Sequence, residues 1–358
     1  MRAFFFTIFL LIASVVFAQS DSTKSSFTLS FYADLYYSYD FGNPENHERP
    51  SFLYNFNRHN EVNMNLGLFN AGYASKNVRA NLGLMAGTYP QYNLASEQPL
   101  LRNLWQANVG LKINRKKNLW LDGGVFPSHI GFESTVSKDC WNLTRSILAE
   151  NSPYYESGVK ISYTSDNAKW YLSGLVLNGW QRIARVNGNN TPAFGTQITF
   201  TPDTKVTFNY STFIGNDKPD SAAQWRYYNN FYLLLHPTDK FGITLGFDYC
   251  KEQRSKGSGE YNSLYSPVVI LHYQCYNKVA IAIRAEYYDD ENGIIISTGT
   301  PNGFRTYGYS LNLDYKINEN ALWRIEGRGL SSKDDIFLSD NTPSNQNYCV
   351  TTSLVIAF

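Results

Sequence analysis

The sequence predicts an all-β protein, a transmembrane, antiparallel, up-and-down β-barrel of about 16 strands with short periplasmic turns and long extracellular loops. Three observations predict this fold class. Apolar and polar residues alternate over long segments, short turns alternate with longer loops, and an alternating segment ends on an aromatic residue. Alternation over roughly ten residues suits a tilted strand that crosses a bilayer, whereas the strands of soluble sheets average ~5–6 residues.

The amino-acid composition agrees with this fold class. The chain holds 27 Tyr and 23 Phe but 3 Met, and 17% of its residues are charged. With a mean hydropathy of -0.35, these values fit strands that are apolar on one face only, with aromatic belts at both membrane interfaces. A formal net charge of +1 gives no electrostatic basis for binding nucleic acid. For a barrel of this class, the expected partners are outer-membrane lipid, small hydrophilic solutes and the barrel-assembly machinery.

Residues 1–18 are predicted to be a cleaved signal peptide. Arg2 provides the positive charge, residues 4–17 form a short apolar run, and Ala18 completes a small-residue cleavage site. The run is shorter than the ~18–20 residues of a membrane-spanning helix, so a membrane anchor is the weaker alternative. We therefore expect export, and a single barrel domain over residues 19–358 in the outer membrane of a Gram-negative cell.

The two ends of the predicted barrel show the clearest alternation. In residues 27–41, Phe27 and every second residue after it form an apolar face, and the residues between them form a more polar face. Residues 346–358 alternate in the same way and end on Phe358. Because the last strand of a closed barrel pairs with the first, we expect Phe358 to lie at the periplasmic rim and to close the barrel.

Between these ends, turns and loops follow one another in a regular order. Seven short turns lie at residues 75–77, 114–118, 165–167, 201–204, 237–240, 276–278 and 318–320. Eight longer, polar or Gly/Pro-rich loops lie at residues 42–60, 88–103, 127–152, 181–192, 216–224, 253–263, 291–303 and 333–345. Fifteen connections join sixteen strands, and an even number of strands returns both ends of the barrel to the same side.

Charged residues occur on the faces that oppose the apolar ones. We predict that eight of them line a pore: Asp34, Lys160, Arg284, Glu286, Asp314, Arg324, Glu326 and Arg328. Such charges would be costly in a packed core, whereas a water-filled lumen hydrates them. Alternation breaks at residues 66–69 and 175–177, where the strand register is left open.

Residues 118–180 resemble the OmpL-like family of β-barrel porins of Gram-negative bacteria. In that family a strand that ends Gly-x-Phe runs into a Pro…Gly-x-Glu segment, which residues 124–133 match. The pair Pro153-Tyr154 then opens the next strand, and residues 178–180 (Asn-Gly-Trp) close the one after it. The resemblance extends more weakly over most of the mature chain and implies an outer-membrane channel.

The third of the long loops, residues 127–152, is the longest. In sixteen-stranded porins the third loop typically folds inward and narrows the channel, which is an analogy of architecture. We therefore expect a constriction with opposing charges and a short helix over residues 140–150, and a solvated external loop is the alternative. The residues predicted to form the constriction are Glu133, Lys138, Asp139, Arg145 and Glu150.

Residues that signal catalysis or metal binding are scattered. The five histidines and four cysteines form no HExxH, no CxxC and no cluster of ligand spacing, and no GxSxG segment occurs. The sequence thus predicts no catalytic residue, cofactor or metal. The predicted function is a porin for passive diffusion of small hydrophilic solutes. The alternatives are a surface-binding protein or adhesin that acts through its extracellular loops, and a barrel enzyme whose site is assembled in space. A homo-oligomer is left open.

Aromatic residues gather near the ends of the predicted strands. They are Tyr154, Tyr155, Trp170, Tyr171, Trp180, Trp225, Tyr227 and Tyr228. We interpret them as anchors at the membrane interfaces, and a track on which sugars stack is the alternative.

Overall fold

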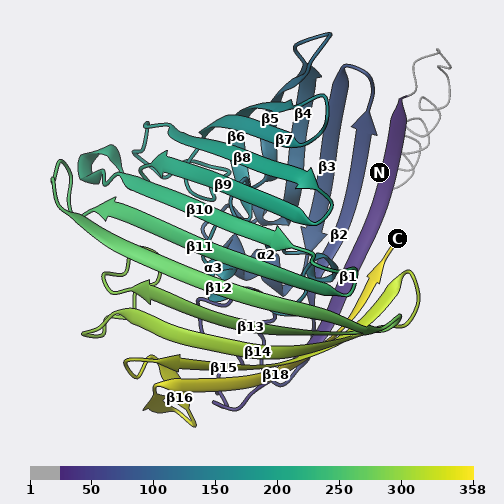
Figure 1. The fold of residues 1–358 in the computed structure, drawn as a ribbon. Coiled ribbons are helices and arrows are strands. Elements are labelled where there is room, and N and C mark those ends of the chain that lie inside the picture. Colours follow the sequence, from purple (N-terminus) through teal and green to yellow (C-terminus); the bar gives the residue numbers. More distant parts are fainter. Residues whose placement is uncertain (1–24) are drawn as a thin grey trace, which may run out of the picture.

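In the computed structural model, which describes residues 25–358, sixteen strands close into an antiparallel barrel (Figure 1). Successive barrel strands pair side by side, and β18 pairs with β1 to complete the ring. The predicted fold class and the predicted number of barrel strands are therefore confirmed. The predicted signal peptide, residues 1–18, lies outside the described residues.

The barrel strands follow the predicted order of turns and loops. They are β1 (Ser26–Asp40), β2 (Val62–Ala74), β3 (Val78–Ala86), β4 (Leu104–Lys112), β5 (Asn118–Pro127), β6 (Tyr155–Thr164), β7 (Trp170–Leu177), β8 (Ala193–Asp203), β9 (Val206–Gly215), β10 (Arg226–Leu235), β11 (Phe241–Gln253), β12 (Tyr261–Tyr276), β13 (Val279–Asp290), β14 (Phe304–Lys316), β15 (Ala321–Ser332) and β18 (Gln346–Ala357). We call the rim with the long loops the loop end, and the other rim the turn end.

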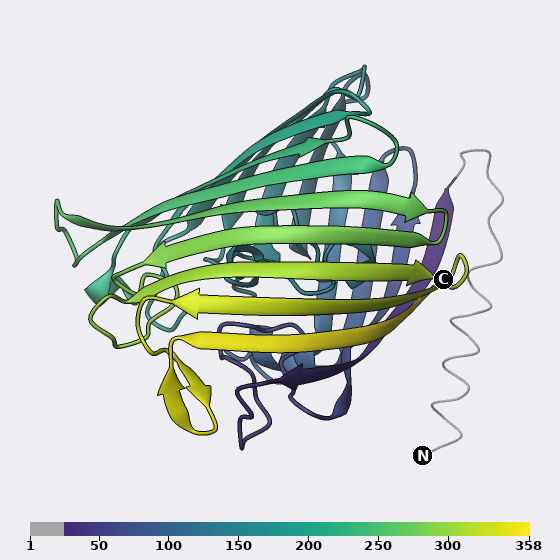
Figure 2. The same cartoon turned by 60° about the horizontal axis from the view of Figure 1, so that its bottom comes forward.

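The remaining elements belong to the long loops. They are α2 (Thr88–Asn93), α3 (Ile147–Glu150), the 3-10 helices η1 (Leu101–Asn103), η2 (Ser137–Asp139) and η3 (Asp220–Ala222), and the two-stranded hairpin of β16 (Phe337–Ser339) and β17 (Thr342–Ser344). The hairpin projects away from the barrel at the loop end (Figure 2). Among residues 25–358, no helix is long and apolar enough to cross a bilayer.

The outer face of the barrel is apolar, as the alternation predicts. On β1, Leu29 and Leu35 are exposed, whereas Tyr32 and Asp34 between them are buried. On β18, Leu354 and Ile356 are exposed, and Val355 faces inward and is 2% exposed. Side chains that are exposed on an isolated barrel in this way are those that lipid would cover.

The two breaks in alternation have different causes. At residues 66–69, the pairing of β1 with β2 shifts between Asp34 and Leu35, so that Asn65 and Leu66 are both buried at a β-bulge. At residues 175–177 the strand is regular, and Leu175 and Leu177 point inward while Val176 faces outward. The inner face is apolar here because it packs against loops inside the barrel.

An apolar cluster fills the interior at the loop end. Its members on the barrel strands lie on the inner faces of β5 and β7 to β15: Phe126, Leu175, Leu177, Ala193, Phe213, Tyr228, Cys250, Leu264, Tyr288, Phe304 and Leu330. Phe337 of β16 also belongs to the cluster. Loop residues, among them Phe52, Leu53, Ile130 and Ile147, pack onto these strands. The interior of the barrel is therefore apolar in part, because the loops buried inside it need apolar contacts of their own.

Several aromatic residues predicted as interface anchors belong to this interior. Tyr228 is buried on the inner face, Tyr155 is buried in a neighbouring cluster, and Trp180 packs against Phe213 with ring centroids 5.0 Å apart. The anchor interpretation is wrong for these three residues. Trp170 and Tyr227 are 42% and 39% exposed, and for these two residues the interpretation stays a prediction.

The helix expected within residues 140–150 is shorter than predicted. Only Ile147–Glu150 are helical, and the side chain of Ser146 accepts a hydrogen bond from the N–H of Ala149 as its N-cap. The preceding backbone cannot be helical because its N–H groups are used elsewhere. Leu143 donates to Asn312 and Thr144 to Glu326, both of which belong to the barrel wall.

Candidate functional site

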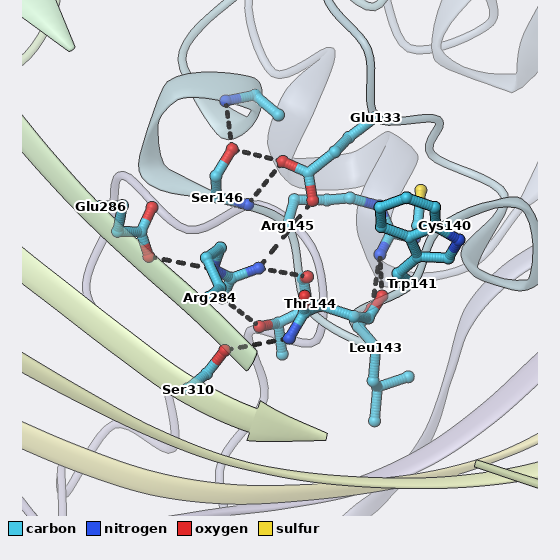
Figure 3. A network of polar contacts seen from close by, with 12 residues as sticks. Glu133, Cys140, Trp141, Leu143, Thr144, Arg145, Ser146, Arg284, Glu286 and Ser310 are labelled. Atoms are coloured by element: carbon cyan, nitrogen blue, oxygen red, sulfur yellow. Dashed lines mark hydrogen bonds and ion pairs between the residues drawn. The ribbon is translucent and has the colours of Figure 1, made fainter. Parts of the chain in front are cut away.

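The third loop (residues 128–154) leaves β5, crosses the interior of the barrel and returns at β6. Its middle reaches β13 and β15, on the opposite side of the ring of strands (Figure 3). Thr144 donates to Glu326 of β15 from its N–H and its hydroxyl, at 2.6 and 2.8 Å. The guanidinium of Arg284 on β13 donates to the carbonyl of Thr144 at 2.7 Å. The loop therefore lies inside the barrel and is fixed to its far wall, which is the inward position expected from the analogy with porins.

Arg284 is the centre of a buried cluster of charges. Its guanidinium lies 3.2 Å from a carboxylate oxygen of Glu286, 3.1 Å from one of Glu326 and 3.9 Å from one of Glu133. Arg328 pairs with Glu286 at 2.7 Å. These five side chains are at most 3% exposed. Buried charges of this kind need partners, and here acids from the wall and from the loop provide them.

Arg145 shapes the loop from within. Its fully buried guanidinium donates to the carbonyl oxygens of Ser134, Leu143 and Thr135. Glu133 accepts hydrogen bonds from the N–H and the hydroxyl of Ser146. Burial raises the pKa of Glu133, while the charge of Arg284 opposes that rise. The two predicted constriction residues, Glu133 and Arg145, thus hold the loop in one conformation.

Further contacts attach the first part of the loop. Arg324 of β15 pairs with Asp314 at 2.7 Å and also donates to the carbonyl oxygens of Ser137, Cys140 and Trp141. On β1, the hydroxyl of Tyr32 accepts from the N–H of Ser137 at 3.0 Å and donates to Asp34 at 2.9 Å. A second hydroxyl, that of Ser353, also donates to Asp34. Asp34, Asp314 and Arg324 therefore support the loop from three strands.

Glu150 joins the third loop to the first loop (residues 41–61). Its carboxylate accepts from the N–H of Tyr54 at 3.0 Å and from the N–H and side-chain amide of Asn55. Burial raises the pKa of Glu150 to about 7. Residues 52–57 of the first loop are packed inside the barrel, where Phe56 is 0% and Leu53 is 2% exposed.

The structure thus brings together most of the predicted site residues but separates three of them. Lys138 and Asp139 pair with each other at 3.1 Å and are 42% and 52% exposed. Lys160 lies on the other wall, on β6, with its ammonium 4.7 Å from the ring centre of Phe126. Of the eight residues predicted to line a pore, Lys160 and Asp314 are partly exposed, and the other six are buried, several of them beneath the third loop.

Some polar residues on the inner wall were missed. Asp122 on β5 pairs with Arg79 on β3, and the Nε–Oδ1 distance is 2.6 Å. Both lie between outward apolar residues, so the alternation alone could have assigned them to the inner face. His129 and Glu156 are also buried, 3.9 Å apart, and the imidazole donates to the carbonyl of Thr212 at 2.8 Å. Burial lowers the pKa of His129 to about 4.

Acidic, histidine and cysteine side chains do not gather as metal ligands within residues 25–358. The four cysteines in this part of the chain are free thiols, and Cys250 pairs across the sheet with Leu264.

Comparisons with known proteins agree with this geometry. The model of the family described as "Putative beta-barrel porin-2, OmpL-like" matches residues 26–358. No curated protein matches the sequence. Among solved structures, the anion-selective porin of Comamonas acidovorans has a TM-score of 0.61 at 9% identity, over 94% of this chain and 100% of that chain.

Two further structures share the fold. The trimer form of OmpT from Vibrio cholerae, folded in vitro, has a TM-score of 0.59 at 10% identity, over 93% of this chain and 99% of that one. The outer-membrane channel DcaP of Acinetobacter baumannii has a TM-score of 0.60 at 9% identity, over 93% and 97% of the two chains. At these identities the likeness concerns the fold.

Proposed function

Because the chain belongs to the OmpL-like porin-2 family of β-barrel porins, we propose that it forms a water-filled channel in the outer membrane. Small hydrophilic solutes would cross it by passive diffusion. The family and the fold point to a channel and not to an enzyme.

The observation that carries this proposal is a polar inner wall crossed by a charged loop. Toward the turn end, the inner faces of β3 to β9 carry amide, hydroxyl and charged groups. Asn81 bonds Asn108 at 2.9 Å, Gln197 bonds Asn209 at 3.0 Å, and Lys160 lies on the same side. The outward neighbours of these residues are apolar and exposed, such as Leu82, Val109 and Ile161. An inner wall of this kind suits water, and the outer wall suits lipid.

We propose that the third loop sets the width of the channel. The loop occupies interior space, and the first loop is bonded to it through Glu150. The charges of Glu133, Lys138, Asp139, Arg145 and Glu150 would then contribute to the field that a solute meets. Since three of these five are engaged in buried contacts, Lys138 and Asp139 are the ones that face water.

Single-channel recording in planar bilayers tests the proposal. The wild-type protein is expected to give discrete conductance steps, and deletion of residues 137–148 is expected to give larger ones. Deletion of residues 339–342, the tip of the projecting hairpin, is the control and should leave the conductance unchanged, because it keeps Phe337, which is buried in the interior cluster. Heat-modifiable migration in gels shows which variants are folded. If folded wild-type protein gives no conductance steps, the porin proposal is wrong. If the steps after the loop deletion equal those of the wild type, the proposed constriction is wrong.

A surface-binding role is the second candidate, and the projecting hairpin of β16 and β17 favours it (Figure 2). Residues 52–57 of the first loop and most of the third loop are packed inside the barrel. If the protein is an adhesin, deletion of residues 339–342 should abolish binding of cells to their target while conductance persists. Unchanged binding would rule out the hairpin as the adhesive part.

A homo-oligomer is part of the proposal, because one related fold, that of Vibrio cholerae OmpT, has a trimer form. The mass of the protein in detergent, measured by light scattering, tests this. A mass of about 41 kDa or less after detergent correction would show a monomer, since one chain has a mass of 40.8 kDa.

A further inference from the structure

The outer face of the barrel is hollowed over β1 to β5, and two basic turns lie beside the hollow. We propose that an anionic phospholipid binds here, with an acyl chain in the hollow and its phosphate against the turns. The inference goes beyond the channel function, because it concerns the outward face of the barrel and not the lumen.

The hollow has a volume of ≈ 490 Å³ and is lined mainly by apolar side chains. Small residues make the depression. One row of paired residues across the five strands consists of Phe27, Tyr73, Ala80, Val109 and Gly123. Phe27 and Val109 are 60% and 64% exposed, so this row faces outward. An added Cβ at Gly123 would meet nothing closer than the carbonyl oxygen of Gly158, at 3.9 Å.

The two turns beside the hollow carry basic residues and no acid. They join β2 to β3 and β4 to β5, and their basic residues, all exposed, are Lys76, Arg115, Lys116 and Lys117. The turns are neighbours, because the N–H of Lys112 donates to the carbonyl of Asn77 at 2.9 Å (Figure 1, top). Among residues 25–358, only Lys117 of these four pairs with an acid, Asp166, at 2.7 Å. The two turns therefore present positive charge that this part of the chain leaves largely unpaired.

The hollow and the basic turns are spaced as the two parts of a phospholipid are. Tyr73, Ala80 and Val109 lie two to four residues from the turns, which is roughly 7–13 Å along a strand. Leu111 and Ile113, 57% and 50% exposed, continue the apolar surface up to the second turn. Lipid headgroups lie directly outside the hydrocarbon layer. An acyl chain in the hollow thus brings its phosphate to the level of the turns.

The charge of the turns selects the ligand. Lys and Arg near a membrane surface attract anionic headgroups, and guanidinium groups pair well with phosphate. A second copy of this chain, docked symmetrically through the same face, would instead bring two sets of basic turns together, and like charges oppose such a contact. Charge complementarity therefore favours a phospholipid with a net negative headgroup as the occupant.

A second hollow on the outer face provides a comparison. It has a volume of ≈ 510 Å³ and lies over β13, β14, β15 and β18, where Gly327 forms part of its lining. This hollow reaches Phe41 at the loop end, so none of the basic turns is beside it. An added Cβ at Gly327 would meet nothing within 4 Å. Gly327 is therefore a matched control for Gly123.

Native mass spectrometry of the folded protein in neutral detergent, titrated with dioleoylphosphatidylglycerol or dioleoylphosphatidylcholine, tests the proposal. The wild type is expected to retain phosphatidylglycerol in preference to phosphatidylcholine. The triple variant Lys76→Gln, Arg115→Gln, Lys116→Gln should bind phosphatidylglycerol at least tenfold more weakly, since each charge contributes up to roughly fivefold. Its binding of phosphatidylcholine should not change. Gly123→Leu fills the hollow and should weaken the binding of both lipids.

Two controls match these variants. The triple variant Lys205→Gln, Lys240→Gln, Lys278→Gln removes three exposed charges from other turns of the same rim and should bind both lipids as the wild type does. Gly327→Leu fills the second hollow and should also leave the binding of phosphatidylglycerol unchanged. Heat-modifiable migration shows which variants are folded, and Ala80→Leu replaces Gly123→Leu if the latter does not fold.

Three results would overturn the proposal. They are equal retention of the two lipids by the wild type, equal losses in the two triple variants, and equal binding by Gly123→Leu and Gly327→Leu. Light scattering without added lipid tests the other occupant. If Gly123→Leu turns an oligomer into a monomer and still binds phosphatidylglycerol normally, a second copy covers this face and the lipid does not.

Conductance in bilayers of phosphatidylcholine alone separates this proposal from the porin function. Conductance steps from a protein that shows no lipid preference would refute the lipid site and leave the porin standing. A lipid preference in a protein that gives no steps would do the reverse.

Discussion

Arg284 on β13 and Glu326 on β15 form an ion pair of 3.1 Å inside the barrel, and both bond to Thr144 of the third loop. The two wall residues and the loop residue are separated by 140 and 182 positions in the sequence. One pair therefore stabilises the barrel wall and also holds the loop across the interior. Changes to either partner should affect both properties.

Glu326→Gln should lower the free energy of unfolding by roughly 1–3 kcal/mol, because it removes a buried charge that Arg284 and Thr144 both use. Urea unfolding in detergent micelles measures this. Asp139→Asn, in the exposed pair with Lys138 on the same loop, is the control and should change little, since exposed pairs contribute little. Equal effects of the two substitutions would show that the buried pair does not stabilise the barrel.

Phe358 pairs with Phe31 across the seam that closes the barrel. Each backbone N–H donates to the carbonyl of the other residue, at 2.7 and 3.0 Å, and the rings stack with centroids 5.2 Å apart. Deletion of Phe358 should reduce the fraction of protein that inserts, as followed by heat-modifiable migration. Nine further residue pairs, from Tyr32 to Asp40, hold the seam, so barrels that do insert should keep their conductance.

Phe358→Tyr keeps the ring and both backbone hydrogen bonds, and it should insert nearly as well as the wild type. If the deletion variant inserts normally, the terminal aromatic residue has no role in closing the barrel.

The architecture could be predicted because it depends on local patterns. Period-two alternation defines the strands, and the order of short turns and long loops fixes how many there are. The sequence predictions were incomplete or wrong at the places where loops occupy the interior of the barrel. Leu175 and Leu177 point inward although they are apolar, because they pack on loops. Residues 140–146 form no helix, and the barrel wall accepts the hydrogen bonds of the Leu143 and Thr144 N–H groups.

The candidate site could be predicted only in part. The inward position of the third loop followed from an analogy of architecture, and Glu133, Arg145 and Glu150 do lie inside the barrel. Their partners could not be predicted, because contacts such as Thr144 with Glu326 depend on the closed ring and leave no periodic signal in the sequence. Lys138 and Asp139 have the same charges as the buried residues, and only the fold separates them.

Because of Glu150, the free energy of unfolding should fall as the pH rises from about 4.5 to about 7. Its pKa in the folded protein is about 7, above the ordinary value of 4.5, because it is buried. Within this range the folded state keeps a proton that the unfolded state has lost. Stability should therefore fall by about 1.4 kcal/mol per pH unit, or by about 3 kcal/mol in all.

His129 acts in the opposite direction. Its pKa of about 4 lies below the ordinary 6.5, so its contribution to stability is present above pH 6.5 and is lost as the pH falls toward 4. The two effects offset each other in the wild type. The difference in urea midpoint between wild type and Glu150→Gln, measured from pH 4.5 to 8, isolates Glu150. A difference that does not vary with pH would show that this carboxyl ionises normally.

Lys160 should favour anions in the channel, because this residue lies on the polar inner wall and is partly exposed there. A unit charge ~6 Å from an ion in water changes its energy by roughly 0.7 kcal/mol, which is roughly threefold in relative occupancy. Lys160→Gln should therefore lower the chloride-to-potassium permeability ratio roughly threefold or more, as read from the reversal potential in a KCl gradient.

Lys205→Gln, at the exposed turn between β8 and β9, removes the same charge outside the lumen and should leave the ratio unchanged. Since Asp122 is opposite Lys160 in the pairing of β5 with β6, Asp122→Asn should shift the ratio the other way. Equal ratios in all four proteins would mean that ions do not pass along this wall.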